Sequence, residues 1–152
     1  MIGPPGLPQA SGSREASFWR SLKIQLKKTR PKWLATRIEG ASTPGLPDVL
    51  LADETGRFHL VELKICTAFS VRLSSQQVSF LTRYARVGAS VWILVRQQRP
   101  DGDFVFLFYG SQAVELVERG MKKITPAGKW QFPVDWDSVF ARLSAGNRIS
   151  SP

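Results

Sequence analysis

The sequence predicts a single α/β domain in which a mixed β-sheet is flanked by helices. Three observations support this fold class. Two short apolar runs are joined by a turn, as in a β-hairpin. A helical pattern and a nearly continuous apolar run follow, an order typical of a crossover between parallel strands. The chain has 152 residues, of which 43% are hydrophobic and 22% charged, enough for one buried core.

The folded domain is expected over residues 14–143. Residues 1–13 are rich in Pro, Gly and Ser without periodicity, which predicts a disordered leader, and residues 144–152 are expected to form a flexible tail. No run of eighteen apolar residues occurs, and the first residues do not resemble a signal peptide. We therefore expect a cytoplasmic protein without membrane association, not secreted, in a nucleoid-associated or phage-infected host setting.

The first predicted element is a helix over Arg14–Lys28, capped by Ser13 and with one apolar stripe. Glu15 falls on that stripe, where it either favours the positive end of the helix dipole or reaches a site under the helix. A short strand is expected at Ala35–Ile38. It leads into the turn-rich segment 40–45, whose glycines and proline let the backbone approach a ligand closely.

The hairpin comprises the runs Pro44–Leu51 and Phe58–Ile65. Between them, Glu54–Gly56 fits a three-residue loop with a type I turn followed by a left-handed glycine. This loop places Asp48 opposite Glu62, whereas a loop one residue longer would shift the register by one.

Beyond the hairpin, the pattern alternates between helix and strand. The predicted elements are a loop Cys66–Leu73 carrying Arg72, a helix from the cap Ser74 to Val87, a strand Ser90–Arg96, a strand Phe104–Tyr109, a helix Gln112–Arg119, an irregular segment with Trp130 and a helix Asp135–Leu143.

Three charged residues of the hairpin share one predicted face. Lys64 follows Glu62 by two residues, so the pleat turns it to the side of Glu62 and Asp48. Like charges opposite each other destabilise a hairpin, so a cation between the carboxylates or a shared proton is expected, and a divalent metal is the simpler explanation. Alternatively, Asp48 caps a turn and the other two residues lie on a solvated face.

The residue types limit the possible chemistry. Cys66 is the only cysteine and His59 the only histidine, which argues against cysteine-based zinc clusters, multi-histidine metal sites and His-based triads. A carboxylate site favours hard ions such as Mg²⁺ or Mn²⁺.

The formal net charge of +9 and the pI of about 10.3 favour a polyanionic partner, most simply nucleic acid. Six of these nine net charges lie within residues 1–44. A basic patch on the first helix and its exit loop is implied, although a solvated helix face would have the same composition.

In this order, the motifs resemble the PD-(D/E)xK nuclease superfamily with its restriction-endonuclease-like fold, and within it the VRR-NUC domains and phage Holliday-junction resolvases. The resemblance covers Arg14 to Arg96. The matching residues are Gly45-Leu46-Pro47-Asp48 for G-x-P-D, Glu62-Leu63-Lys64 for E-x-K, Leu73-Ser74-Ser75-Gln76-Gln77 for L-S-x-x-Q, then Phe80, Gly88 and the strand Val91–Val95.

This resemblance implies a metal-dependent deoxyribonuclease acting in DNA recombination or repair. Asp48, Glu62 and the Leu63 carbonyl would hold Mg²⁺ or Mn²⁺, with Glu15 as a further ligand and Glu39 as its competitor. Lys64 and Gln77 would assist catalysis. A homodimer acting on branched DNA is expected; a flap, single-strand or nicking nuclease, a non-catalytic nucleic-acid-binding module and a protein scaffold are the alternatives. The expected phosphate contacts are Lys27, Lys28, Arg30, Lys32, Arg37 and Arg72.

Overall fold

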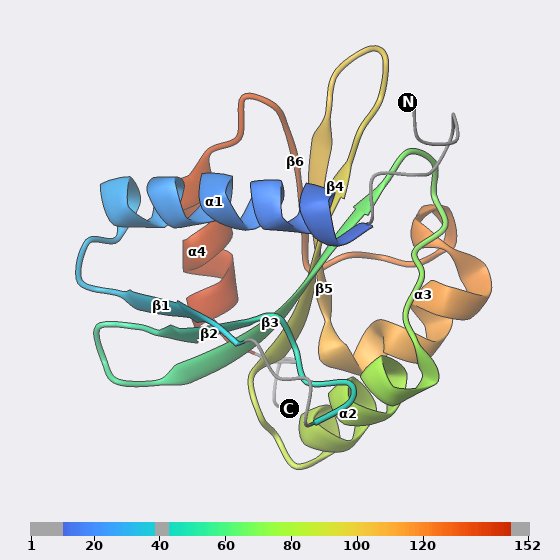
Figure 1. The fold of residues 1–152 in the computed structure, drawn as a ribbon, viewed down its shortest axis with the longest axis horizontal. Helices are drawn as coiled ribbons and strands as arrows, with labels where there is room; N and C mark the ends of the chain where they lie inside the picture. Colours follow the sequence, from blue (N-terminus) through green and yellow to red (C-terminus); the bar gives the residue numbers. More distant parts are fainter. Residues whose placement is uncertain (1–10, 39–42, 147–152) are drawn as a thin grey trace, which may run out of the picture.

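A six-stranded mixed sheet forms the centre of the structure, a computed structural model that describes residues 11–38 and 43–146 (Figure 1). Its strands lie in chain order and are β1 (Leu34–Arg37), β2 (Val49–Ala52), β3 (Phe58–Cys66), β4 (Val91–Gln97), β5 (Phe104–Tyr109) and β6 (Gly128–Gln131). The helices are α1 (Ser11–Thr29), α2 (Ser75–Arg86), α3 (Ala113–Arg119) and α4 (Trp136–Ser144), with short 3-10 turns η1 (Gly110–Gln112) and η2 (Met121–Lys123).

Neighbouring strands are antiparallel except for β3 and β4, which are parallel and connected through α2. A parallel pair needs a crossover, and the helical pattern that ends before Gly88 supplies it. The predicted fold class, a mixed α/β sheet flanked by helices, is therefore confirmed.

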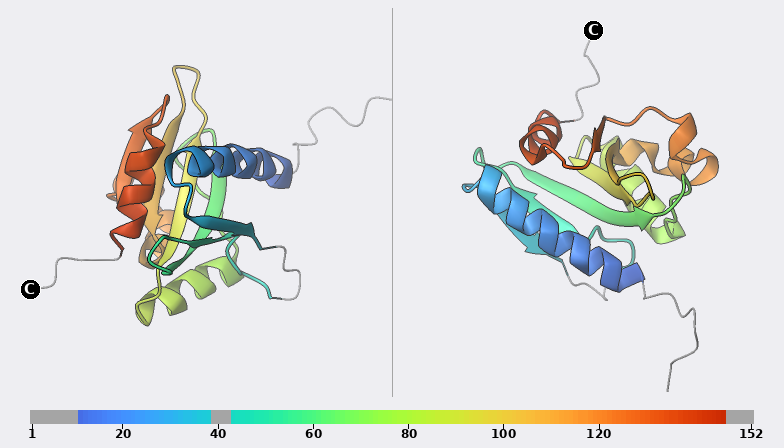
Figure 2. Two further views of the ribbon diagram at one scale, coloured as in Figure 1. Left: turned by 90° about the vertical axis from the view of Figure 1, so that its left-hand side faces the viewer. Right: turned by 90° about the horizontal axis from the view of Figure 1, so that it is seen from above.

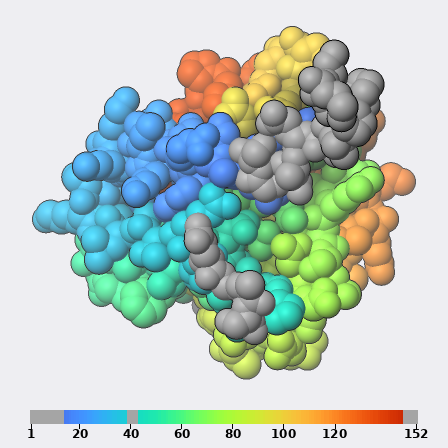
Figure 3. Space-filling view, viewed as in Figure 1, coloured from blue at the N-terminus to red at the C-terminus, as the bar shows by residue number. Residues whose placement is uncertain are grey.

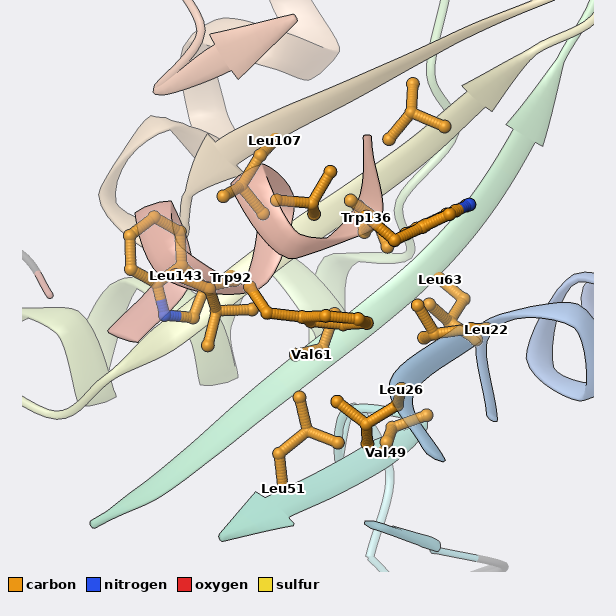
Figure 4. Packing of buried hydrophobic residues seen from close by; sticks show 14 of the residues in the cluster. Leu22, Leu26, Val49, Leu51, Val61, Leu63, Trp92, Leu107, Trp136 and Leu143 are labelled. Carbon is orange, nitrogen blue, oxygen red and sulfur yellow. The ribbon is translucent and has the colours of Figure 1, made fainter. Parts of the chain in front are cut away.

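The two faces of the sheet bury separate hydrophobic clusters. One cluster joins α1 and α4 to alternate residues of the central strands, as Figure 4 shows for Leu22 and Leu26 of α1 packing near Val49, Leu51 and Leu63. The other joins α2 and α3 to the opposite residues of β4 and β5. In the left view of Figure 2, strands β1 and β2 lie between α1 and α2. Side chains that alternate along β3 therefore face different helices.

The β2–β3 turn has the predicted three-residue loop. The Asp53 N–H donates to the Arg57 carbonyl at 3.0 Å, and Gly56 has the left-handed φ of 84°. The pairs from Val49–Val61 to Ala52–Phe58 follow from it, so the predicted register is confirmed.

Behind this turn, Asp53, His59 and Ser90 form a buried hydrogen-bonded chain. His59 Nε2 lies 2.9 Å from Asp53 Oδ2, and His59 Nδ1 lies 2.6 Å from Ser90 Oγ, which also accepts a bond from Trp92 Nε1. The expectation that a single histidine precludes such a triad was wrong, because one histidine suffices to link an aspartate and a serine. The Ser90 hydroxyl is buried and hydrogen-bonded to both His59 and Trp92, so it is not available as a nucleophile. The three hydrogen-bonded residues instead tie the β2–β3 turn to the start of β4.

Some element boundaries differ from the predictions. Residues 128–131 form the edge strand β6, where an irregular segment was expected, because pairing with β5 compensates for the low strand propensity of Gly-Lys-Trp-Gln. Helix α1 begins at Ser11, so Ser13 is not its cap and residues 11–13 are helical. Residues 1–10, 39–42 and 147–152, and with them Glu39, lie outside the described residues. Within the described part of the chain, no helix has the length and apolar character needed to cross a membrane.

The buried histidine predicts how stability depends on pH. Burial lowers the pKa of His59 below its ordinary value of about 6.5, against the opposing effect of Asp53. Below that pH the unfolded chain gains a proton that the folded chain does not, so the folded state loses stability as pH falls.

We expect the unfolding free energy of the native protein, relative to that of His59→Asn, to shrink by up to about 1.4 kcal/mol per pH unit below pH 6.5. Urea unfolding of both proteins between pH 8 and pH 5 measures this difference, and other titrating groups cancel in it. A difference that stays constant over this range would contradict a neutral buried His59.

Candidate active site

Asp48 and Glu62 lie side by side where β2 and β3 part. Val49 and Val61 form the last backbone pair, and at the next position Asp48 Oδ2 accepts a hydrogen bond from the Leu63 N–H at 2.9 Å. The N–H and C=O of a residue in a strand point to the same side, so the Leu63 carbonyl also faces β2. The hairpin thus gathers two carboxylates and a main-chain carbonyl.

Glu62 is buried, with 1% of its surface exposed, which excludes the alternative of a solvated strand face. Gln77 Nε2 donates to Glu62 Oε2 at 3.2 Å and Lys64 Nζ lies 3.8 Å from the same oxygen. Within the described residues, Glu62 Oε1 is buried and has no hydrogen-bond partner. A buried carboxylate oxygen without a partner costs free energy unless a proton or a cation satisfies it.

Electrostatics indicate the same need for a cation. Burial, then the charge of Asp48 and a hydrogen bond with it, raise the pKa of Glu62 to about 9, and the nearby Lys64 only partly opposes this. Without a cation, Glu62 therefore stays protonated at neutral pH. The sequence predicted either a shared proton or a metal ion between the carboxylates. The structure indicates that a proton and a metal ion would compete for the same two carboxylates.

Gln77 has two roles that its sequence position alone did not separate. Its Oε1 accepts from the Ser74 N–H at 2.9 Å, and its N–H donates to Ser74 Oγ at 3.1 Å, which makes a capping box at the start of α2. The remaining amide Nε2 then points to Glu62. The cap therefore fixes the orientation of the side chain that contacts the carboxylate.

Gly45 holds the first turn of α2 against the Pro47–Asp48 loop. Its φ is 87°, and a Cβ at this position would lie 2.3 Å from the Gln76 carbonyl oxygen. The missing Cβ therefore lets the backbone approach α2; the expected approach to a ligand stays a prediction.

Glu15, in the first turns of α1, reaches the same region. Burial raises its pKa; Lys64 and Arg37 oppose this, and Asp48 adds to it. These couplings place Glu15 within electrostatic range of Asp48 and Lys64, which favours the interpretation that it faces a site under the helix. Arg37, paired with Val49 across β1 and β2, lies at the same edge.

The predicted basic residues separate into two groups. Arg37 is close to the site, and Arg72 is exposed in the loop two residues before the Ser74 cap of α2, the helix that supplies Gln77. Lys28 follows Glu15 by thirteen residues, about 20 Å along α1 at about 1.5 Å per residue. Lys27 and Lys32 lie near that far end, where Arg30 is bound to Asp137 at 2.9 Å. The second group can contact only nucleic acid well away from the carboxylates.

Across the described ranges, no group of three or more His, Cys, Asp or Glu side chains is arranged to hold a metal ion. The available donors are the Asp48 and Glu62 carboxylates, the Leu63 carbonyl on the same side of β3 and, more distant, Glu15. All are oxygen donors, the type that Mg²⁺ and Mn²⁺ prefer.

Comparison with known proteins gives structural likeness only. No protein-family model matches the sequence, and no curated protein matches it. A Holliday junction resolvase, Hjc of Archaeoglobus fulgidus, is 22% identical, with a TM-score of 0.48 over 65% of this chain and 75% of the resolvase. A VRR_NUC domain is 18% identical, with a TM-score of 0.45 over 70% of this chain and 96% of that domain.

The close approach at Gly45 predicts a steric effect that a second glycine can control. Gly45→Ala forces an alanine into a left-handed conformation and makes its Cβ collide with α2. Gly56→Ala, at φ 84°, has the same backbone strain, but no atom lies within 4 Å of the added Cβ. We expect Gly45→Ala to lower the unfolding free energy by at least about 1 kcal/mol more than Gly56→Ala. Urea unfolding measures both, and equal losses would contradict the packing of Gly45 on α2.

Proposed function

We propose that this chain is an endonuclease that hydrolyses DNA phosphodiester bonds with Mg²⁺ or Mn²⁺. The observation that supports this most is the closeness of the half-buried Asp48 to the buried Glu62, one of whose oxygens has no hydrogen-bond partner within the described residues. Two carboxylates held this close cost free energy that the nearby Lys64 only partly offsets, so a further cation would stabilise them.

The donors at this place suit a hard divalent ion. Asp48, Glu62 and the Leu63 carbonyl would hold it, and Glu15 would contribute directly, through a water molecule or through a second ion. When bound, such an ion supplies stabilisation of the negative charge on the scissile phosphate and a water that is easier to deprotonate.

The neighbouring polar side chains would prepare the substrate. Lys64 would offset phosphate charge and orient or help deprotonate the attacking water, because it lies on the same strand face as Glu62. Gln77, fixed by the capping box, would orient Lys64 or the phosphate. Arg37 and Arg72 would bind adjacent phosphates, which predicts affinity that falls with added salt and depends little on base sequence.

The proposal predicts selective loss of cleavage. Asp48→Asn, Glu62→Gln and Lys64→Ala should each slow Mg²⁺-dependent DNA cleavage about a thousandfold, the equivalent of about 4 kcal/mol of transition-state stabilisation. DNA binding measured in EDTA should persist. Glu115→Gln, which removes an exposed carboxylate on α3, should cleave at the native rate.

Full cleavage by the Glu62→Gln protein would reject the assignment. Salt-sensitive DNA binding by the native protein, without any product when Mg²⁺ or Mn²⁺ is titrated, would instead support a non-catalytic nucleic-acid-binding module.

We propose further that the substrate is branched DNA and that the chain acts as a homodimer, since a two-fold axis would present two sites to opposing strands. A groove between α2 and α3 offers the surface. It is lined by Leu73, Val78, Val114 and Val117, with Arg83 and Arg86 on the α2 side. Glu118 is exposed on α3, so a two-fold arrangement in which α2 of one copy faces α3 of the other would pair the arginines with Glu118.

A panel of DNA forms distinguishes the possible substrates. We expect a four-way junction to be cut at least about tenfold faster than plain duplex, a nicked duplex or a flap. Sedimentation should give twice the chain mass of 17.0 kDa. Preferred cutting of the flap or of nicked duplex would replace the junction proposal with that substrate, and uniform digestion of linear duplex would reject branch selectivity.

A further inference from the structure

A row of aligned residues, buried at Val95 and Phe106, crosses the sheet from the proposed site to its far edge. Strand pairing aligns Lys64 of β3 with Val95, Phe106 and Lys129 on β4, β5 and β6. Since aligned residues share a face, Lys129 lies on the face that contains Lys64 and Glu62. The next row on this face contains Phe104, about 13 Å along the strands from the level of Glu62 at about 3.3 Å per residue.

Cations lie over the aromatic rings of this region. Lys129 Nζ is 4.9 Å from the ring centroid of Phe104 and 5.4 Å from that of Phe106. The guanidinium of Arg99 is 5.1 Å from the Phe104 ring. Lys122 Nζ is 5.6 Å from the ring of Phe69. We call these exposed and half-exposed residues the basic aromatic strip: Phe69, Arg99, Phe104, Lys122 and Lys129.

The loop that presents Phe69 begins directly after β3 and is fixed at several points. Gln97 Nε2 donates to the Ala68 carbonyl at 2.7 Å, and the Met121 N–H donates to the Phe69 carbonyl at 2.8 Å. Phe69 nevertheless has 38% of its surface exposed. Because hydrogen bonds fix this loop, the Phe69 ring stays exposed to solvent, where a ligand can contact it.

The charge of the strip is positive. Arg99 is bound to Asp101 at 3.1 Å, but among the described residues no carboxylate lies within 4.0 Å of the Lys122 or Lys129 ammonium group. Lys123 adds a further exposed cation beside Lys122. The strip therefore favours an anionic ligand with flat apolar parts.

We infer that the basic aromatic strip binds nucleotides with unpaired bases, which stack on Phe69 and Phe104 while the lysines contact their phosphates. Bases in a duplex are already stacked on one another, so aromatic rings cannot stack on them. An unpaired base has an exposed face on which a ring can stack. Phe104 lies about 13 Å along the strands and, two strands from β3 at about 4.8 Å each, about 10 Å across the sheet, so it is about 16 Å from Glu62. This inference rests on the proposed function for the identity of the substrate, and it specifies that the branched DNA opens at the branch point and exposes unpaired bases beside the cut.

The test compares two probes on the full chain: a fluorescent fifteen-nucleotide oligo(dT) and a fifteen-base-pair duplex, both in EDTA so that nothing is cleaved. Phe69→Ala and Phe104→Ala should each weaken oligo(dT) binding about five- to a hundredfold and change duplex binding less than twofold. Phe58→Ala is the matched control, since Phe58 is 65% exposed at the other end of β3, and it should change neither. Lys129→Gln should weaken both probes and reduce the salt dependence.

Equal weakening of both probes, or unchanged oligo(dT) binding by Phe69→Ala, would overturn the inference. Phe69 is exposed, so its variant tests the strip even where Phe104→Ala does not fold, as checked by circular dichroism. Because no metal is present, a chain that never cleaves DNA can still show the contrast between probes. The experiment can therefore reject the binding of unpaired bases independently of whether the protein is a nuclease.

Discussion

The repulsion between Asp48 and Glu62 is the constraint on which the site depends. Both side chains could avoid it by turning to solvent, yet Glu62 is buried and Asp48 is bound to the Leu63 N–H. The hairpin register enforces this closeness, because a three-residue turn leaves no other pairing for the two strands. Burial and the charge of Asp48 raise the pKa of Glu62 despite the nearby Lys64, so the pair favours a bound proton when no metal ion is there.

The helices around the hairpin serve the same pair. Gly45 lets the first turn of α2 approach the loop before Asp48, and the capping box then directs Gln77 to Glu62. From the other side, the start of α1 carries Glu15 toward Lys64. The parallel pairing of β3 and β4 requires a crossover connection, which α2 provides. The same helix therefore also supplies the Gln77 amide to the site.

Local chemistry explains how much of this could be predicted. A left-handed glycine in a short turn fixes the pairing over several residues, so the neighbourhood of Asp48 and Glu62 followed from Gly56 alone. Strand β6 could not be found in this way, because its pairing partner β5 is some twenty residues away and its own residues do not favour a strand. The sequence predicted Ser74 as the helix cap, but only the fold shows that Gln77 completes a capping box and keeps one amide group free for Glu62.

Positive charge lies on two sides of the carboxylate pair, and the two sides differ in kind. Helix α1 leads away from the end of β3 and carries exposed lysines (Figure 1); Lys23 lies 5.9 Å from the ring of Trp19, but that ring is buried and cannot stack on a base. The strip near the β4–β5 hairpin combines lysines with phenylalanine rings, and the hairpin forms part of the projecting surface in Figure 3. Charge alone suits a duplex, whose outer surface is phosphate, while rings suit unstacked bases. A nucleic acid that used both surfaces would be paired on the α1 side of the proposed site and unpaired on the other, the arrangement found where a duplex opens.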